Sequence, residues 1–468
     1  MRWALAALLI TACGTPVPET DAGAEPDDAG TTSDAGTTTT DAGTTTDAGT
    51  TTDAGTTSDA GTDAGTTTSD GGTTTILYPV GQTHSPLTPE VVAHLRAIAA
   101  MDSTRAPNVL SKVGDSNTVS TGYLNCFAGN FVDLDGRTTL DAGLAHFRTG
   151  MVQGSSAFSR TSLSATIGWS AQSAVAGTPS PLQQEIDAAN PRYATVMFGT
   201  NDVGFANPDL YGRSMVPLID TLSMQGVVPI ITAVPPRDDS STANAWVPRY
   251  NLVARAIAQS RRIPFVDLHR ELQPVPAHGL SGDGVHLSTY IPSAGTRGCF
   301  FTSAGLDFGQ NVRNLATLEA LNRAWLAVES NTPSDTTAPR FAGSGLPSDE
   351  IVIPSLPFVD ARDTRTQGAA VIPNYPGCAA TQNESGREVL YRFEVTQPIN
   401  LRAFVISLGS SDIDLHLLTA ADGASCLQRN DKLITRSLSA GTYWLSLDTY
   451  ESTAGQLPGE YLLVVMAE

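Results

Sequence analysis

Short apolar runs alternate with helix-like stretches between residues 86 and 330, and this alternation limits the possible folds more than any other feature of the chain. The strand-like runs lie at 108–114, 193–199, 227–233 and 263–268. The helix-like stretches lie at 89–100, 215–225, 245–259 and 306–327. Strands that alternate with helices usually pair in parallel, with helices on both faces of the sheet. We therefore predict an α/β domain with a parallel sheet at 76–330.

The pattern changes after a polar stretch rich in Pro, Ser, Thr and Gly at 331–348, which is interpreted as a linker. From 349 to 468 the apolar residues alternate in short runs that are separated by Gly, Ser and Asp. These runs lie at 389–395, 401–408, 413–418, 442–447 and 461–465. Such a pattern is typical of an antiparallel β-sandwich.

Residues 14–75 repeat Thr-Thr-Thr-Asp-Ala-Gly with small variations, and they hold 12 acidic residues, no basic residue and no aromatic residue. Such a segment buries too little apolar surface to offset its ordering entropy, so we expect a disordered tether. A glycosylated, stiffer stalk is the alternative. The chain has 27 basic and 47 acidic residues, for a net charge of −20. Because no basic stripe is present, nucleic-acid binding is not expected.

The first 13 residues have the character of an export signal. Arg2 is followed by an apolar run at 3–10, which is shorter than the roughly 20 residues that span a bilayer. The run ends in Leu-Ile-Thr-Ala-Cys at 9–13, which resembles a bacterial lipobox. The resemblance implies that Cys13 is lipidated and anchors an exported lipoprotein to a membrane, at the cell surface or in the periplasm. An ordinary cleaved signal is the alternative.

The other four cysteines divide into two pairs, one in each predicted folded region. We expect disulfides between Cys126 and Cys299 and between Cys378 and Cys426, since exported proteins meet an oxidising compartment. Free buried thiols are the alternative. The cysteines do not have the spacing of a zinc site, and no metal is expected.

Three short motifs carry the chemical argument. Gly-Asp-Ser-Asn at 114–117 and Gly-Thr-Asn-Asp at 199–202 each close an apolar strand, and Gly-Asp-Gly-Val-His occupies 282–286. Ligands of α/β sheets bind where parallel strands end. Asn201 has an amide that can stabilise an oxyanion, whereas Asp202 is interpreted as the cap of the loop or helix that follows. An Asp and a His three residues apart can pair, and the histidine can then accept a proton from a serine.

These three motifs, in this order, resemble those of the SGNH (GDSL-like) hydrolases, over about residues 105–327. The resemblance implies a flavodoxin-like three-layer α/β/α fold and a catalytic site with Ser116 as nucleophile, His286 as base and Asp283 as orienting acid. It also implies an oxyanion hole formed by the backbone N–H groups of Ser116 and Gly168 and by the Asn201 amide.

Two features depart from the family's pattern. The fourth position of the first motif is Asn117, where the name-giving motif has Leu. The glycine of the oxyanion hole has several candidates. We choose Gly168, which follows the alternating run 163–167 and precedes a helical pattern at 169–176, with Gly154 and Gly150 as the other candidates.

Residues 385–466 resemble the bacterial pre-peptidase C-terminal (PPC-like) β-sandwich, through Leu-Tyr-Arg-Phe at 390–393, Asp-Ile-Asp-Leu-His-Leu at 412–417 and Ala-Gly-Thr-Tyr-Trp-Leu at 440–445. The family is carried by secreted enzymes. Asp412 and Asp414 are interpreted as outward-facing acids of a strand rather than as calcium ligands.

Together these features predict a serine ester hydrolase that acts through an acyl-enzyme, with no metal or cofactor. The expected substrates are short acyl esters, such as O-acetyl groups of polysaccharides, or lipid esters. The alternative is a non-catalytic surface lipoprotein that binds glycans or proteins. We expect a monomer.

Overall fold

The computed structural model describes residues 74–468, which belong to one compact unit. The predicted export signal, its Cys13 and all but the last two residues of the repeat segment 14–75 lie outside the described residues. Among residues 74–468, no helix has the length and apolar character that a bilayer crossing requires.

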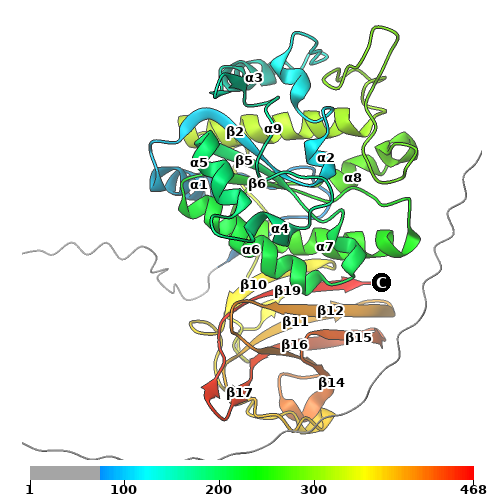
Figure 1. Cartoon of the computed structure of the whole chain (residues 1–468). Helices are drawn as coiled ribbons and strands as arrows, with labels where there is room; N and C mark the ends of the chain where they lie inside the picture. Colours follow the sequence, from blue (N-terminus) through cyan, green and yellow to red (C-terminus); the bar gives the residue numbers. More distant parts are fainter. Residues whose placement is uncertain (1–73) are drawn as a thin grey trace, which may run out of the picture. The chain divides into compact units, whose positions relative to one another are not determined.

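A parallel four-stranded sheet with the order β2-β5-β6-β7 lies at the centre of the region 76–330 (Figure 1). Its strands are β2 (Ala106–Gly114), β5 (Pro191–Met197), β6 (Val228–Thr232) and β7 (Phe265–Val266). Every residue of β5 and β6 is buried, as expected for strands that are covered on both faces. The predicted parallel sheet is therefore confirmed.

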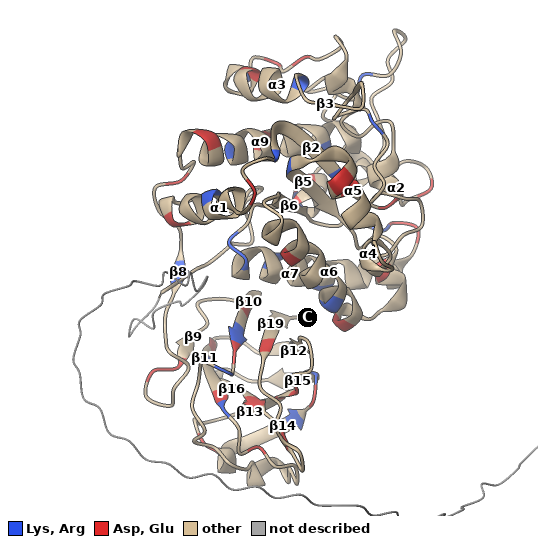
Figure 2. Ribbon diagram, turned by 60° about the vertical axis from the view of Figure 1, so that its left-hand side comes forward, with Lys and Arg blue, Asp and Glu red and all other residues tan. Residues whose placement is uncertain are grey.

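Helices cover both faces of this sheet. α1 and α9 pack together on one face, and α6 and α7 pack together on the other (Figures 1 and 2). The helices are α1 (Pro89–Met101), α2 (Ser116–Val119), α3 (Asp141–Arg148), α4 (Ala171–Val175), α5 (Pro181–Ala189), α6 (Pro208–Met224), α7 (Ser241–Ser260), α8 (Leu268–Leu272) and α9 (Gly309–Ser330). The result is the three-layer α/β/α arrangement that the resemblance implied.

The C-terminal region forms two larger sheets, with the orders β10-β19-β12-β15 and β14-β13-β16-β11-β9, and a two-stranded sheet of β17 (Glu451–Ser452) and β18 (Gly455–Gln456). All their pairings are antiparallel except that of β11 with β9. The strands are β9 (Ile351–Val352), β10 (Phe358–Asp363), β11 (Glu388–Val395), β12 (Ile399–Ser407), β13 (Ile413–Leu418), β14 (Cys426–Asn430), β15 (Leu433–Leu438), β16 (Gly441–Thr449) and β19 (Glu460–Ala467). The predicted antiparallel β-sandwich is confirmed.

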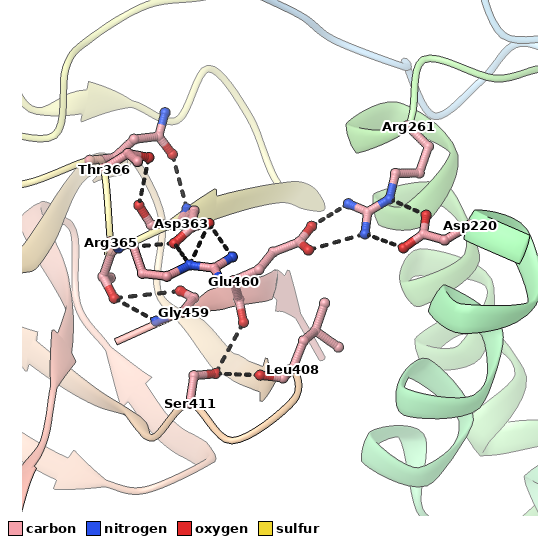
Figure 3. A network of polar contacts seen from close by, with 11 residues as sticks. Asp220, Arg261, Asp363, Arg365, Thr366, Leu408, Ser411, Gly459 and Glu460 are labelled. Carbon is pink, nitrogen blue, oxygen red and sulfur yellow. Dashed lines mark hydrogen bonds and ion pairs between the residues drawn. The ribbon is translucent and has the colours of Figure 1, made fainter. Parts of the chain in front are cut away.

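Apolar and charged contacts join the sandwich to the α/β region. Ile406 and Val464 belong to the same buried cluster as the central sheet. Arg261, at the end of α7, is held between the carboxylates of Asp220 from α6 and Glu460 from β19 (Figure 3). The predicted linker 331–348 contains a short strand, β8 (Arg340–Phe341), which pairs with β1 (Thr75–Ile76).

One expectation for the sandwich is wrong. Asp414 does not face outward: its residue is buried, and its carboxylate accepts a hydrogen bond from Arg429 at 2.7 Å. The reason is that β13 is an inner strand between β14 and β16, and all six of its residues are buried. Among the described residues, no group of three or more His, Cys, Asp or Glu side chains is placed to hold a metal ion.

Asp414 is part of a larger group of buried ionisable side chains. Tyr375 stacks on the His416 ring and donates a hydrogen bond to Asp448 at 2.5 Å. Burial, with the Asp414 charge nearby, raises the pKa of Glu384 to about 8, and burial raises the pKa of Glu388 to about 7. Burial lowers the pKa of His416 to about 3, so this histidine is neutral at physiological pH.

We expect these carboxyl groups to make the stability of the sandwich fall as the pH rises. Glu384 and Glu388 bind protons more tightly in the folded chain, so their stabilising effect is present at low pH and is lost through about pH 7–8. His416 acts in the opposite direction, but only below its usual pKa of about 6.5. The midpoint temperature of thermal unfolding should therefore decrease as the pH rises from about 6.5 to about 8.5. The decrease should be about 2–4 °C for each kcal/mol of unfolding free energy that is lost.

The matched variants for this test are Glu384→Gln, which removes one buried titrating group, and Glu394→Gln on the same region's exposed surface. Glu384→Gln should weaken the dependence of the midpoint on pH, and Glu394→Gln should leave it unchanged. A midpoint that rises over this pH range would contradict the expectation.

Candidate active site

The first motif lies in the turn between β2 and α2. β2 ends at Gly114, Asp115 caps α2 by accepting a hydrogen bond from the Asn117 N–H at 3.0 Å, and Ser116 is the first residue of the helix. A Cβ atom at Gly114 would lie only 2.3 Å from Oγ1 of Thr118, so the turn requires glycine here. The serine is thereby placed at the carboxyl end of a parallel strand, the position where α/β sheets bind ligands.

The third motif forms a tight loop that brings His286 to Ser116. Nε2 of His286 lies 2.9 Å from Oγ of Ser116, and Nδ1 of His286 lies 2.6 Å from Oδ2 of Asp283. The other carboxylate oxygen of Asp283 accepts hydrogen bonds from the backbone N–H groups of Val285 and His286, both at 3.0 Å. The three side chains thus form a continuous hydrogen-bonded chain.

The surroundings keep Asp283 ionised. Its contact with the His286 side chain, followed by the two backbone N–H groups, holds the pKa of the Asp283 carboxyl well below its usual range. An ionised carboxylate can only accept, so in the neutral imidazole Nδ1 of His286 carries the proton and Nε2 is the atom that can accept one from Ser116. The side chains of His286 and Asp283 are 46% and 50% exposed, so the pair lies at an open surface.

The loop is supported by a segment that the sequence analysis did not single out. The backbone N–H groups of Asp238 and Asp239 donate to the carbonyl of Gly284 at 2.9 and 3.3 Å. Gly284 has a φ of +68°, and a Cβ atom there would lie 2.6 Å from the Asp239 nitrogen. The close approach of two backbones explains the glycine between Asp283 and His286. Residues 238–239 have no sequence pattern that would have indicated this contact.

Asn201 and the segment before α4 lie together beside the end of β2. Nδ2 of Asn201 donates to the carbonyl of Trp169 at 2.8 Å. Thr166 donates its N–H to the carbonyl of Gly114 at 3.2 Å, two residues before the serine. Gly168 lies between Thr166 and Trp169, so both ends of its short segment are attached to motifs of the site.

The other two glycine candidates belong to the segment that follows α3. Gly150 packs against the carbonyl of Asn108, which is six residues before Gly114. At about 3.3 Å per strand residue, this is roughly 20 Å from the end of the strand. Gly154 lies in the hairpin of β3 (Met151–Val152) and β4 (Ser155–Ser156), which directly follows Gly150.

Asp202 does not have the capping role that we expected. Its Oδ1 accepts a hydrogen bond from the backbone N–H of Ala171 at 3.1 Å, so it joins the Asn201 loop to the start of α4. The reason is that the side chain is buried toward α4 instead of facing the helical turn that follows. Burial, together with the nearby Asp115 charge, raises the pKa of Asp202 to about 6.

Both predicted disulfides are present. Cys126 is bonded to Cys299, and Cys378 is bonded to Cys426. Beside the first, the backbone N–H of Asp133 donates to the Cys299 carbonyl at 2.9 Å. Disulfides of this kind are typical of proteins in oxidising compartments outside the cytoplasm.

We expect loss of the Cys126–Cys299 bond to reduce both stability and activity. The bond closes a loop with a sequence separation of 173, and removal should cost about 5 kcal/mol in the chain-entropy model. It also fastens the segment after His286, so the Cys126→Ser/Cys299→Ser variant should lose activity at temperatures where circular dichroism still shows a folded chain.

The second disulfide supplies the control. Its sequence separation is 48, so the Cys378→Ser/Cys426→Ser variant should lose about 4 kcal/mol, with no direct effect on the rate of the folded protein. If the first pair of substitutions lowers activity only in proportion to the unfolded fraction, the link between this bond and the site is wrong.

One family model matches the part of the chain that contains this site. The model of the GDSL-like Lipase/Acylhydrolase family matches residues 113–290, a range that contains all three motifs. No curated protein was found to be similar to the sequence.

Several solved structures resemble parts of the chain. A catalytic mutant of an acetylxylan esterase from Geobacillus stearothermophilus has 16% identity and a TM-score of 0.30, and the match covers 46% of this chain and 94% of that one. A GDSL-like lipase from Bacteroides thetaiotaomicron has 15% identity and a TM-score of 0.28, with 50% and 99% covered. The pre-peptidase C-terminal domain of a collagenase from Bacillus anthracis has 15% identity and a TM-score of 0.17, with 24% and 91% covered.

The motif order, the parallel sheet and the family match lead to one assignment. Residues 113–290 match the GDSL-like lipase/acylhydrolase family, and this part of the chain is a hydrolase of ester bonds.

Proposed function

We propose that Ser116 is the nucleophile of this hydrolase, that His286 is its general base and acid, and that Asp283 orients the histidine. The observation that carries the proposal is the hydrogen-bonded chain from Asp283 through His286 to Ser116, with separations of 2.6 and 2.9 Å. Both distances are within the reach that proton transfer requires. A module that only binds glycans or proteins has no need of this chain, so the geometry favours the enzyme.

The reaction proceeds in two acyl-transfer steps. His286 takes the Ser116 proton as Oγ attacks the ester carbonyl, and it then gives this proton to the leaving alcohol. A water molecule then attacks the acyl-enzyme with His286 again as base, and His286 returns this proton to Oγ of Ser116 as the acid is released. The negative oxygen of each tetrahedral intermediate accepts hydrogen bonds from the N–H groups of Ser116 and Gly168 and from the Asn201 amide.

The choice of Gly168 rests on its segment. The Thr166–Gly114 and Trp169–Asn201 hydrogen bonds attach the segment that contains this glycine to the first and second motifs, which supports the choice. Gly150 lies beside Asn108, toward the other end of β2, and Gly154 lies in the hairpin that follows Gly150.

We propose short acyl esters as substrates, in particular O-acetyl groups on polysaccharides. The half-exposed His286 and Asp283 support this proposal, because an acyl group on a large polymer needs a site at an open surface. Lipid esters are the second candidate. They are favoured by Ile167 and Phe205, which are 72% and 60% exposed and lie close in sequence to Gly168 and Asn201.

We also propose that the protein is exported and anchored to a membrane through lipidated Cys13. The two disulfides support an oxidising location, and the lipobox-like Leu-Ile-Thr-Ala-Cys supports the anchor. In fractionation of the producing cells, wild type should follow the membranes and Cys13→Ala should not; equal distribution of both would contradict the anchor.

A panel of chromogenic esters tests the proposed activity and the acyl preference together. The purified chain should hydrolyse acetate esters faster than octanoate or palmitate esters, and release of acetate from acetylated xylan should be measured beside them. A fluorophosphonate should modify one serine, which mass spectrometry should locate at Ser116. A preference for the long chains would select the lipid candidate, and modification at another serine would contradict the assignment of the nucleophile.

A further inference from the structure

The residue directly after the nucleophile contacts the backbone on both sides of the histidine. The Asn117 side chain is completely buried. Its Oδ1 accepts a hydrogen bond from the backbone N–H of Leu287 at 3.0 Å, and its Nδ2 donates to the carbonyl of Val285 at 3.4 Å. These two residues flank His286 in the chain. One buried amide therefore bonds the histidine loop to the turn that carries Ser116.

The turn on the other side of this contact is itself held in place. Arg313, a buried residue of α9, donates to the carbonyl of Asn117 at 2.7 Å and to Oγ1 of Thr118 at 3.0 Å. Its guanidinium lies 3.6 Å from the centre of the Tyr123 ring. The backbone of Asn117 is thus held by α9, and the Asn117 side chain in turn holds the backbone of residues 285–287.

We propose that Asn117 is a positioning residue that sets the distance between Ser116 and His286, an inference that rests on the proposed function. The Asn117–Leu287 bond lies one residue away from the Ser116–His286 bond on both chain segments. Without the Asn117 amide, which also bonds Val285, the Ser116–His286 hydrogen bond would be the one hydrogen bond left between residues 281–287 and residues 114–117. The leucine of the name-giving motif has no polar atom at this position, so it cannot make either contact.

Removal of the amide should lower the rate of the chemical step while substrate binding changes little. A displacement of about 1 Å between reacting groups can cost on the order of 100-fold in rate. We therefore expect Asn117→Leu and Asn117→Ala to lower kcat by about 10- to 100-fold, with KM close to that of wild type. The rate at which a fluorophosphonate modifies Ser116 should fall by a similar factor.

Asn117→Asp supplies an intermediate variant. It has nearly the shape of asparagine and keeps an acceptor for the Leu287 N–H, but it has no amide N–H to donate to the Val285 carbonyl. It should lose less activity than Asn117→Ala. If the three substitutions lower kcat equally, the individual hydrogen bonds do not set the position of His286.

Gln259→Ala is the matched control for general structural damage. The Gln259 side chain is also buried and also bonds two backbone groups, the N–H of Tyr78 at 2.8 Å and the carbonyl of Val359 at 2.9 Å. It has no hydrogen bond to residues 281–287. Gln259→Ala should lower the unfolding midpoint but leave kcat unchanged at temperatures where the chain is folded.

The experiment is kinetics on the full chain, with an acetate ester, well below the unfolding midpoint of each variant. A folded Asn117→Leu protein with wild-type kcat would overturn the positioning role. Ser116→Ala, measured beside it, separates this failure from that of the proposed function. If Ser116→Ala keeps wild-type activity, the proposed function fails, and if it is inactive while Asn117→Leu is fully active, only the positioning role fails.

Discussion

Replacement of Ser116 by alanine is expected to lower kcat by roughly 10⁴- to 10⁶-fold, to the residual rate that binding and oxyanion stabilisation alone support. The physical reason is that alanine has no oxygen to attack the ester, so His286 has no nucleophile to activate. The fold should not change, because the Ser116 side chain is part-exposed at the first position of α2. Steady-state hydrolysis of an acetate ester measures the loss.

Ser120→Ala is the matched control, since this serine follows α2 and its hydroxyl accepts only from the Gly122 N–H at 3.2 Å. It should retain the wild-type rate. His286→Ala should lose about as much as Ser116→Ala, and the double variant should lose no more than either, because the two groups act as a unit. Losses that multiply in the double variant would mean that the two side chains do not share one step.

The positions of the motifs could be predicted from the sequence because of a simple property of parallel sheets. Gly114 ends one apolar strand and Gly199 follows another, and neighbouring parallel strands end at the same edge. The motifs that contain Ser116 and Asn201 were therefore expected to lie together. His286 is only three positions after Asp283, so their contact needed little information from the rest of the chain.

Helix beginnings were predicted less well. The apolar pattern placed the start of one helix at 215 and of another at 245, whereas α6 begins at Pro208 and α7 at Ser241. Each helix has a proline inside it, Pro217 and Pro248, and a proline weakens the expectation of a continuous helix. The capping residue Asn207 followed by Pro208 was the available signal for the true start of α6.

The contacts that join distant segments could not be predicted. Arg313 meets Asn117 across 196 residues, and Leu287 meets it across 170. No periodic pattern records such a pairing, because it depends on how loops and helices pack in three dimensions. Asp414 shows the same limit: alternation placed it on an outer face, and that face is covered by residues 372–384 near the Cys378–Cys426 bond.

Replacement of Asn201 by alanine is expected to lower kcat by about 10²- to 10³-fold, with a smaller effect on KM. An amide nitrogen carries two hydrogens. One of those on Nδ2 is directed at the Trp169 carbonyl at 2.8 Å, which fixes the amide plane and leaves the other for the proposed contact with the oxyanion. Such a preorganised donor acts more strongly on the charged transition state than on the neutral ester, so its loss should appear in kcat.

Asn207→Ala is the control for Asn201→Ala. Asn207 lies six residues further along the same loop, and its side chain accepts from the Leu210 N–H at 3.1 Å as the cap of α6. Its loss should cost about 1 kcal/mol of stability with no change in kcat. Asn201→Asp should be at least as inactive as Asn201→Ala, because a carboxylate would repel the oxyanion. If Asn201→Ala retains a kcat close to wild type while Ser116→Ala is inactive, the oxyanion is stabilised by other donors and the role proposed for the second motif is wrong.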